Sequence, residues 1–146
     1  MELRDITAAY AHDLAIVESF LEKEQNSYVK LIPEISRHII MSGGKRIRPL
    51  LLMITADLFG YRGDGRYPLA TVIEFIHTAS LLHDDVIDHA NMRRGKASAN
   101  RVWGNAASVL VGDYLYATAY RLLTELNNQT VQRLVAWATT TMVEGE

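Results

Sequence analysis

The chain has 146 residues, with 15 Lys and Arg against 17 Asp and Glu, 49% hydrophobic residues and no cysteine. This length fits a single domain, and the hydrophobic share, with 22% charged residues, excludes a disordered or fibrous protein. The formal net charge of -2 argues against nucleic-acid binding, and the lack of cysteine excludes disulfide scaffolds and thiolate zinc sites. Without a signal peptide or an apolar run of membrane-spanning length, the sequence predicts a cytoplasmic protein with no transmembrane segment.

Apolar residues recur at helical spacing along nearly the whole chain, whereas no segment alternates cleanly at the period of two typical of strands. We therefore predict an all-α fold. The expected helices cover residues 3–24, 33–42, 50–59, 68–88 and 106–126, followed by a last helix capped by Thr130. Residues 60–67 and 89–100 are expected to connect them as loops, with a short helix near Trp103.

The strongest chemical signal is the acidic sequence HDDVIDH at residues 83–89. At 100° per residue, His77, Asp84 and Asp88 fall within an arc of about 40° on one helix face. Two carboxylates one turn apart repel each other unless a cation lies between them, and Mg²⁺ binds carboxylates together with phosphate oxygens. A solvated helix end is the alternative, but the apolar residues before the motif favour a magnesium site.

Two basic segments flank this motif in the sequence. GGKRIRP at residues 43–49 combines glycines with Lys45 and Arg48, whose side chains can converge on one phosphate group at a helix start. RRGK at residues 93–96 adds guanidinium groups suited to phosphate oxygens. For the first segment alone an ordinary basic turn is the alternative, and for the second it is a nucleic-acid patch. Acidic and basic groups together predict a site for diphosphate and Mg²⁺.

In order and spacing, these segments resemble the first half of the trans-isoprenyl diphosphate synthases, the polyprenyl synthetase family. The matching stretches are GGKRIRP at 43–49, IEFIHTASLLHDDVID at 73–88 and RRG at 93–95. The resemblance covers essentially the whole chain and implies an isoprenoid-synthase-type helical bundle around a central cavity. It also implies a prenyltransferase that condenses isopentenyl diphosphate with an allylic diphosphate into a medium- or long-chain polyprenyl diphosphate.

The resemblance also implies a role for individual residues. Asp84 and Asp88 would coordinate Mg²⁺ on the allylic diphosphate with Asp85 as a supporting ligand, and Arg93 would contact the same diphosphate. The residues expected to hold isopentenyl diphosphate are Lys45, Arg48, His77 and Arg94. Small side chains at Ala79 and Ser80 would leave the product tunnel open, which favours products longer than farnesyl. Family members are typically homodimers, and the helix over 106–126 is expected near the interface.

The family has a second aspartate-rich motif in its C-terminal half, for which residues 1–146 offer no counterpart. The last helix is also still periodic at Glu146, so we expect this sequence to be the N-terminal part of one longer domain and to be inactive alone. One alternative is a non-catalytic subunit of a heteromeric prenyl synthase. The other is an HD-type metal phosphohydrolase, which would use His83 and Asp84 together with His38 and Asp113.

Overall fold

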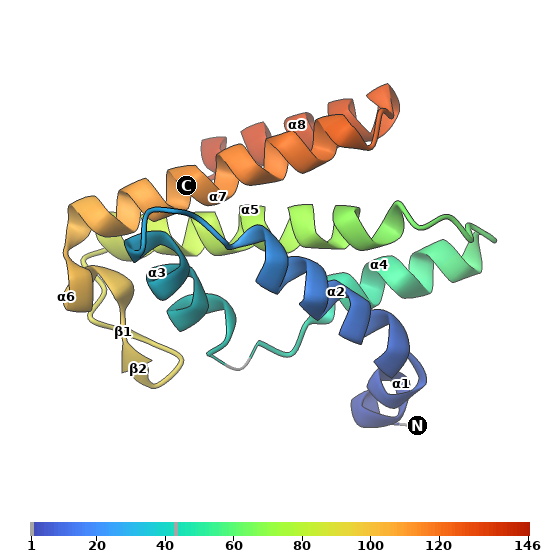
Figure 1. Ribbon diagram of the computed structural model, residues 1–146, viewed down its shortest axis with the longest axis horizontal. Helices are drawn as coiled ribbons and strands as arrows, with labels where there is room; N and C mark the ends of the chain where they lie inside the picture. Colours follow the sequence, from blue (N-terminus) through green and yellow to red (C-terminus); the bar gives the residue numbers. More distant parts are fainter. Residues whose placement is uncertain (1, 43) are drawn as a thin grey trace.

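The computed structural model describes residues 2–42 and 44–146, and these form eight helices and one short hairpin (Figure 1). The helices are α1 (Leu3–Ala9), α2 (Ala11–Glu24), α3 (Leu31–Ile40), α4 (Ile47–Leu58), α5 (Arg66–Ile87), α6 (Ala99–Trp103), α7 (Asn105–Glu125) and α8 (Gln129–Glu144). The hairpin pairs β1 (Met92–Arg93) with β2 (Lys96–Ala97) in antiparallel orientation. The predicted all-α class is confirmed, with a two-stranded hairpin added.

The centre of the molecule is the pair of long helices α5 and α7, which run side by side (Figure 1). Phe75 and Leu82 of α5 and Leu115 of α7 are fully buried. Burial of side chains of this size stabilises the fold by about 1.5–3 kcal/mol each. Helices α2 and α4 pack on α5, and helices α3 and α6 pack on α7. The acidic motif therefore lies at the end of the most buried helix.

Helices α3, α4 and α5 each begin two or three residues before the start that the sequence predicted. Pro33, Pro49 and Pro68 are each the third residue of their helix. Proline is tolerated in a first turn because the N–H that it lacks would have no partner within the helix there. The prolines therefore identified the first turn of each helix correctly, but the predicted helix starts were two or three residues too late.

The helix predicted over residues 3–24 is broken at Tyr10, where φ is −103° and ψ is 15°. The hydroxyl of Tyr10 donates a hydrogen bond to Oδ2 of Asp57 in α4 at 3.0 Å. This partner is 47 positions away along the chain. Because the apolar spacing continues through the break, the periodicity could not reveal it.

Two further predictions of local structure were wrong. Residues 89–100 are not only loop, because Arg94 and Gly95 form a two-residue turn between β1 and β2 with φ of 51° and 76°. Positive φ at both positions is what a type I′ hairpin turn requires, and glycine adopts it without strain. The cap of α8 is Asn128 rather than Thr130, since the Asn128 side chain accepts a hydrogen bond from the backbone of Val131 at 3.1 Å.

Helix α8 is the least embedded element of the fold. None of its residues is buried, and its contacts are made mainly with α7, from which it turns back. The side chains of Leu134, Trp137 and Val143 are each 60% exposed or more. Across the residues described, no helix is both long and apolar enough to cross a membrane.

Candidate functional site

The acidic motif lies at the C-terminal end of α5. Asp84 and Asp88 are one helical turn apart, and the backbone N–H of Asp88 donates to the carbonyl of Asp84 at 2.7 Å. Asp84 is half-buried and Asp88 is exposed, and neither forms an ion pair within residues 2–42 and 44–146. The carboxyl of Glu146 lies near Asp84. A hydrogen bond with Asp84, followed by burial, raises the pKa of Glu146. The acidic end of α5 thus collects negative charge that a cation would stabilise.

Asp85 points in a different direction from its two neighbours in the motif. Its side chain is only 3% exposed, and both of its oxygens accept hydrogen bonds from Arg93 in β1. The distances are 2.5 Å from Nη2 and 3.2 Å from Nε. This pairing raises the pKa of Arg93, which therefore keeps its charge. Of the three aspartates in the motif, Asp85 forms an ion pair, whereas Asp84 and Asp88 form none among the described residues.

The basic turn before α4 also contains both outward-facing and inward-facing charged side chains. Lys45 and Arg48 are exposed, whereas the Arg46 side chain is 13% exposed and points into the protein. Arg46 forms ion pairs with Glu18 of α2 and with Glu74 of α5, the latter at 3.5 Å, and donates to the carbonyl of Ile40 at 3.0 Å. Gly43 of the same motif lies outside the described residues. Arg46 therefore fastens the turn to the protein, while its neighbours face outward.

Sequence reasoning did not find the ion pairs of Arg46. One signal was present, because Glu74 stands within the apolar stretch before the acidic motif and is a charged residue where the helix pattern calls for burial. Burial raises the pKa of Glu74, and the positive charges of Arg46, Arg48 and Arg94 act in the opposite direction. A buried carboxyl in an apolar helix face requires a partner of opposite charge.

The hairpin and the basic turn meet at Gly44. A Cβ atom on Gly44 would lie 2.9 Å from Nη1 of Arg46 and 3.2 Å from Nη1 of Arg94. The absence of a side chain at this position lets the guanidinium of Arg94 approach the turn from the hairpin. Two basic segments that are about 50 residues apart in the sequence are thus brought to one place.

His77 lies in α5 between these basic groups and the acidic end. Its pKa is lowered to about 4, chiefly by burial and then by the positive charges of Arg48, Arg94 and Arg93, which Asp84 only partly offsets. His77 is therefore neutral near pH 7 and can take part in hydrogen bonds without adding charge. The fold brings together His77, Arg48 and Arg94, for which the family resemblance predicts a common substrate.

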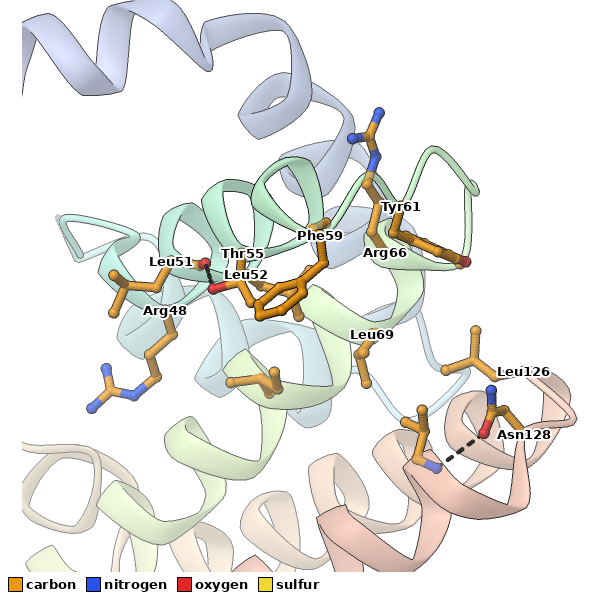
Figure 2. A pocket seen from close by; sticks show the side chains of 14 residues that line it. Arg48, Leu51, Leu52, Thr55, Phe59, Tyr61, Arg66, Leu69, Leu126 and Asn128 are labelled. Carbon is orange, nitrogen blue, oxygen red and sulfur yellow. Dashed lines mark hydrogen bonds between the residues drawn. The ribbon is translucent and has the colours of Figure 1, made fainter.

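Two apolar cavities adjoin this cluster. One of about 400 Å³ lies between α5 and α8 and is lined by Arg48, Ile76, His77, Leu134, Ala138 and Met142, among others. The other, of about 710 Å³, runs along α4 toward the turn between α7 and α8. Figure 2 shows Arg48 at one side of this larger cavity and Tyr61 and Asn128 at the other. Arg48 and Ile73 line both cavities, so an apolar space begins directly beside the charged groups.

Ala79 and Ser80, the two residues assigned to chain length, are placed differently. Ala79 is fully buried within the hydrophobic core. Ser80 is 8% exposed, and its hydroxyl donates to the carbonyl of His77 at 2.7 Å. At 100° per residue, Ser80 lies between Ile76 and Asp84 on the cavity side of α5, and Ala79 lies about 100° away from it. Neither residue is among those that line the two cavities.

The constellation required by an HD-type phosphohydrolase is not formed. The ring of His38 packs edge-on against Trp103, with centroids 4.9 Å apart, and its Nε2 is 2.9 Å from the carbonyl oxygen of Ala97. His83 instead contacts Asp113 at 3.3 Å, within the interface between α5 and α7. In the part of the chain that the structure describes, no three His, Asp or Glu side chains gather as a metal-binding group. His38 is a packing residue.

A sequence model of the polyprenyl synthetase family matches residues 29–146. The octaprenyl diphosphate synthase of Escherichia coli K12 is 45% identical over all 146 residues, which correspond to 45% of that protein. The decaprenyl diphosphate synthase of Rhodobacter capsulatus superimposes with a TM-score of 0.93 at 42% identity, over 97% of this chain and 44% of its own.

A polyprenyl synthase from Caulobacter crescentus, solved with calcium and isoprenyl diphosphate, gives a TM-score of 0.95 at 41% identity. This match covers 99% of the present chain and 44% of that chain. The chain thus spans less than half the length of the relatives and solved structures that it matches here.

Proposed function

Because the chain belongs to the polyprenyl synthetase family, we propose that it contributes to a prenyltransferase that joins isopentenyl diphosphate to an allylic diphosphate. The product would be a medium- or long-chain polyprenyl diphosphate. The observation that carries this proposal is that the two basic segments, two carboxylates and an apolar space lie next to one another along α5, with the apolar space beside residues 73–77 and the carboxylates at Asp84 and Asp88. The likeness to octaprenyl and decaprenyl diphosphate synthases supports the longer products.

The proposed reaction places the two substrates at different groups. Arg93 contacts the allylic diphosphate, whereas Lys45, Arg48, His77 and Arg94 hold isopentenyl diphosphate. The allylic carbon–oxygen bond breaks, the double bond of isopentenyl diphosphate attacks that carbon, and a proton is lost from the product. Charge grows on the departing diphosphate, so fixed positive groups around it lower the barrier. Because His77 is neutral near pH 7, it can donate a hydrogen bond to a diphosphate oxygen without adding a positive charge of its own.

The residues present fit a magnesium ion at the end of α5. Asp84 and Asp88 offer oxygen ligands one turn apart, and in the part of the chain that the structure describes no cationic side chain forms an ion pair with either. Mg²⁺ is usually held by one or two carboxylates and completes its shell with water and substrate phosphates. When bound, it would neutralise the negative charge of the allylic diphosphate. Asp84 and Asp88 are thus proposed ligands, and for Asp85 the same role stays a sequence prediction.

Incorporation of labelled isopentenyl diphosphate in the presence of farnesyl diphosphate tests the proposed reaction. We expect the complete gene product to incorporate the label with Mg²⁺ and to lose this activity in excess chelator. The assay uses the complete gene product because the chain spans less than half the length of its relatives. Absence of incorporation with every allylic primer tested would contradict the proposal.

Asp84→Asn tests the metal assignment separately. The substitution removes one negative charge from a half-buried ligand while keeping its size, so turnover should fall by orders of magnitude with the fold intact. Asp64→Asn, at an exposed position in the loop before α5, is the matched control and should leave turnover unchanged. Turnover and far-UV circular dichroism are measured for both, and an active Asp84→Asn enzyme would show that the ligands are wrongly assigned.

A non-catalytic subunit of a heteromeric prenyl synthase is the alternative function. Such a role would not require a complete set of charged groups at this end of α5, yet all those assigned to the two diphosphates are present. The two functions are distinguished by assaying the purified gene product alone and then with added cell extract from the same organism. Activity that depends on the added extract would favour the subunit.

We also propose that the protein forms a homodimer through α7. The side chain of Leu110 is 65% exposed and that of Tyr120 is 41% exposed on the outer side of this helix. Exposed apolar side chains mark an interaction surface where they form a contiguous patch. Sedimentation velocity of the complete gene product should therefore give a dimer, and a monomer at micromolar concentration would contradict this assembly.

A further inference from the structure

The ion pair between Asp85 and Arg93 links the two parts of the proposed site that surround the allylic diphosphate. Asp85 lies in α5 between the two proposed metal ligands, and Arg93 lies in β1 of the hairpin. The proposed function accounts for Arg93 and leaves Asp85 with two possible roles. It could turn toward the metal, or it could act through Arg93.

The burial of Asp85 argues against contact with a metal. The residue is 2% exposed, whereas Asp84 is half-buried and Asp88 exposed. At 100° per residue along the helix, Asp85 points about 100° away from Asp84 and 60° away from Asp88. To bind a metal beside them, its carboxylate would have to leave both hydrogen bonds to Arg93 and an enclosed position. Breaking a buried ion pair in this way is costly.

The geometry of the pair instead favours a fixed guanidinium. Asp85 accepts from Nη2 and Nε of Arg93, which is the two-point pairing that sets the plane of an arginine side chain. Nη1 of Arg93 has no hydrogen bond within residues 2–42 and 44–146. The negative charges of Asp84 and Asp88 act on Arg93, so its guanidinium lies near the proposed metal ligands. Asp85 thus fixes the Nε and Nη2 side of the Arg93 guanidinium, and Nη1 can donate to a diphosphate oxygen.

The backbone around the hairpin reinforces this arrangement. The carbonyl of Asp85 accepts from the backbone N–H of Ala90 at 2.9 Å and from Nδ2 of Asn100 at 3.4 Å. The carbonyl of Ala90 in turn accepts from Nδ2 of Asn100 at 3.0 Å and from the hydroxyl of Ser98 at 2.9 Å. The segment that carries Arg93 is thus tied to the end of α5 through both the backbone and the side chain of Asp85.

We propose that Asp85 is a positioning residue that holds the guanidinium of Arg93 toward the allylic diphosphate and is not a ligand of the metal. This inference rests on the proposed function. It divides the acidic motif into two carboxylates for the metal and one for the arginine. An asparagine at position 85 would keep only one of the two acceptor oxygens, and its NH₂ group would face an N–H group of Arg93.

A double-mutant cycle of Asp85→Asn and Arg93→Gln tests this role in the complete gene product. We expect Asp85→Asn to raise the KM for the allylic diphosphate or lower kcat by about 10-fold or more, the usual effect of removing an orienting partner. The KM for isopentenyl diphosphate and the Mg²⁺ concentration for half-maximal rate should stay within about 2-fold of wild type. In the Arg93→Gln background, Asp85→Asn should have no further effect, because the residue it orients is gone.

A binding measurement adds a readout that does not depend on turnover. Calorimetric titration with inorganic diphosphate in saturating Mg²⁺ should show the same weakening, about 10-fold, for Asp85→Asn and for Arg93→Gln. Arg93→Lys keeps the charge but lacks the planar fork, so it should reproduce the loss without removing the buried carboxylate. This variant also tests the proposal if Asp85→Asn does not fold.

Three results would overturn the inference. They are a raised Mg²⁺ requirement in Asp85→Asn that matches Asp84→Asn, independent effects of the two substitutions in the cycle, and an Arg93→Lys enzyme with wild-type kinetics. The proposed function would fail differently, since wild-type protein would then neither incorporate isopentenyl diphosphate nor bind Mg²⁺ with diphosphate.

Discussion

Within the proposed substrate site, His77 is the residue whose pKa burial and neighbouring charges lower to about 4. Because its pKa is lowered to about 4 in the folded protein, against 6.5 for an unperturbed histidine, the unfolded chain binds a proton that the native state does not. Between these two pH values, acidification therefore favours the unfolded state, and stability increases as pH rises through this window. Above pH 6.5 this contribution is complete.

Urea unfolding at pH 7 and pH 5 measures this effect. Carboxylates also begin to titrate at the acid end, so the comparison is made between wild type and His77→Gln at the same pH values. The loss of stability from pH 7 to pH 5 should be smaller in His77→Gln, because the glutamine cannot take up the proton. His12→Gln, at an exposed position, is the control for the loss of a histidine. An unchanged pH dependence in His77→Gln would mean that His77 is not held neutral.

Residue by residue, the sequence located the outward-facing charges better than the inward-facing ones. Lys45, Arg48, Asp84 and Asp88 stand in recognisable motifs, and the family resemblance predicts a role for each. The partners of Arg46 could not be found in this way, because Glu18 and Glu74 lie 28 residues away on opposite sides. The same holds for Arg93: the resemblance predicts contact with the allylic diphosphate, but its ion pair with Asp85 appears only in the structure. Such pairs depend on tertiary packing rather than local spacing.

Among the secondary-structure elements, the contact between α5 and α7 depends on a single missing side chain. A Cβ atom on Gly112 would lie 2.3 Å from Nε2 of His83, a nitrogen that is 3.2 Å from the carbonyl oxygen of Val109. The imidazole ring is rigid, so the two helices would have to separate or the ring would have to leave its partner. Glycine at this position therefore sets how closely the two central helices approach.

Gly112→Ala should consequently destabilise the protein by about 1–3 kcal/mol, the usual cost of overpacking a buried contact. Within a helix, replacing glycine by alanine is otherwise stabilising by about 0.5–1 kcal/mol, so the sign of the change identifies the steric effect. Chemical denaturation gives the free energy of unfolding. Ala117→Gly, at an exposed position of α7, is the control for helix propensity alone. A more stable Gly112→Ala protein would show that the close approach is not needed.

The helices themselves were predictable because their apolar faces repeat at the helical period and the prolines mark their first turns. The break at Tyr10 and the hairpin could not be predicted from the sequence, for different reasons. The break accompanies a hydrogen bond to Asp57 in a distant helix. The hairpin has strands of two residues each, which are too short for any alternating pattern to be recognised, although glycine in RRG was a turn signal.

Considered as a whole molecule, the fold is held together at the basic turn by one half-buried arginine. Arg46 joins α2 through Glu18, the end of α3 through the carbonyl of Ile40, and α5 through Glu74. The Glu74 side chain is 8% exposed, so loss of its partner would leave a buried charge. The same arginine supports the backbone that presents Lys45 and Arg48.

Arg46→Met should destabilise the protein by about 3–5 kcal/mol, because it leaves the carboxylate of Glu74 buried without a cation. Arg46→Met combined with Glu74→Met should recover much of this loss, since a buried pair replaced by apolar side chains is often neutral. Arg37→Met, at an exposed position of α3, is the matched control. Thermal and urea unfolding give the values, and a double variant no more stable than Arg46→Met would contradict this explanation.

The product chain length tests the central claim most directly, because it requires the charged site and the apolar space beside it to act together. The complete gene product is incubated with isopentenyl diphosphate, Mg²⁺ and either farnesyl diphosphate or a shorter allylic diphosphate, and the products are separated by chain length. We expect polyprenyl diphosphates longer than farnesyl, and shorter products from Ser80→Phe, which places a ring on the cavity side of α5. Wild-type synthesis from shorter primers that stops at farnesyl, or a Ser80→Phe enzyme with an unchanged product distribution, would contradict the account.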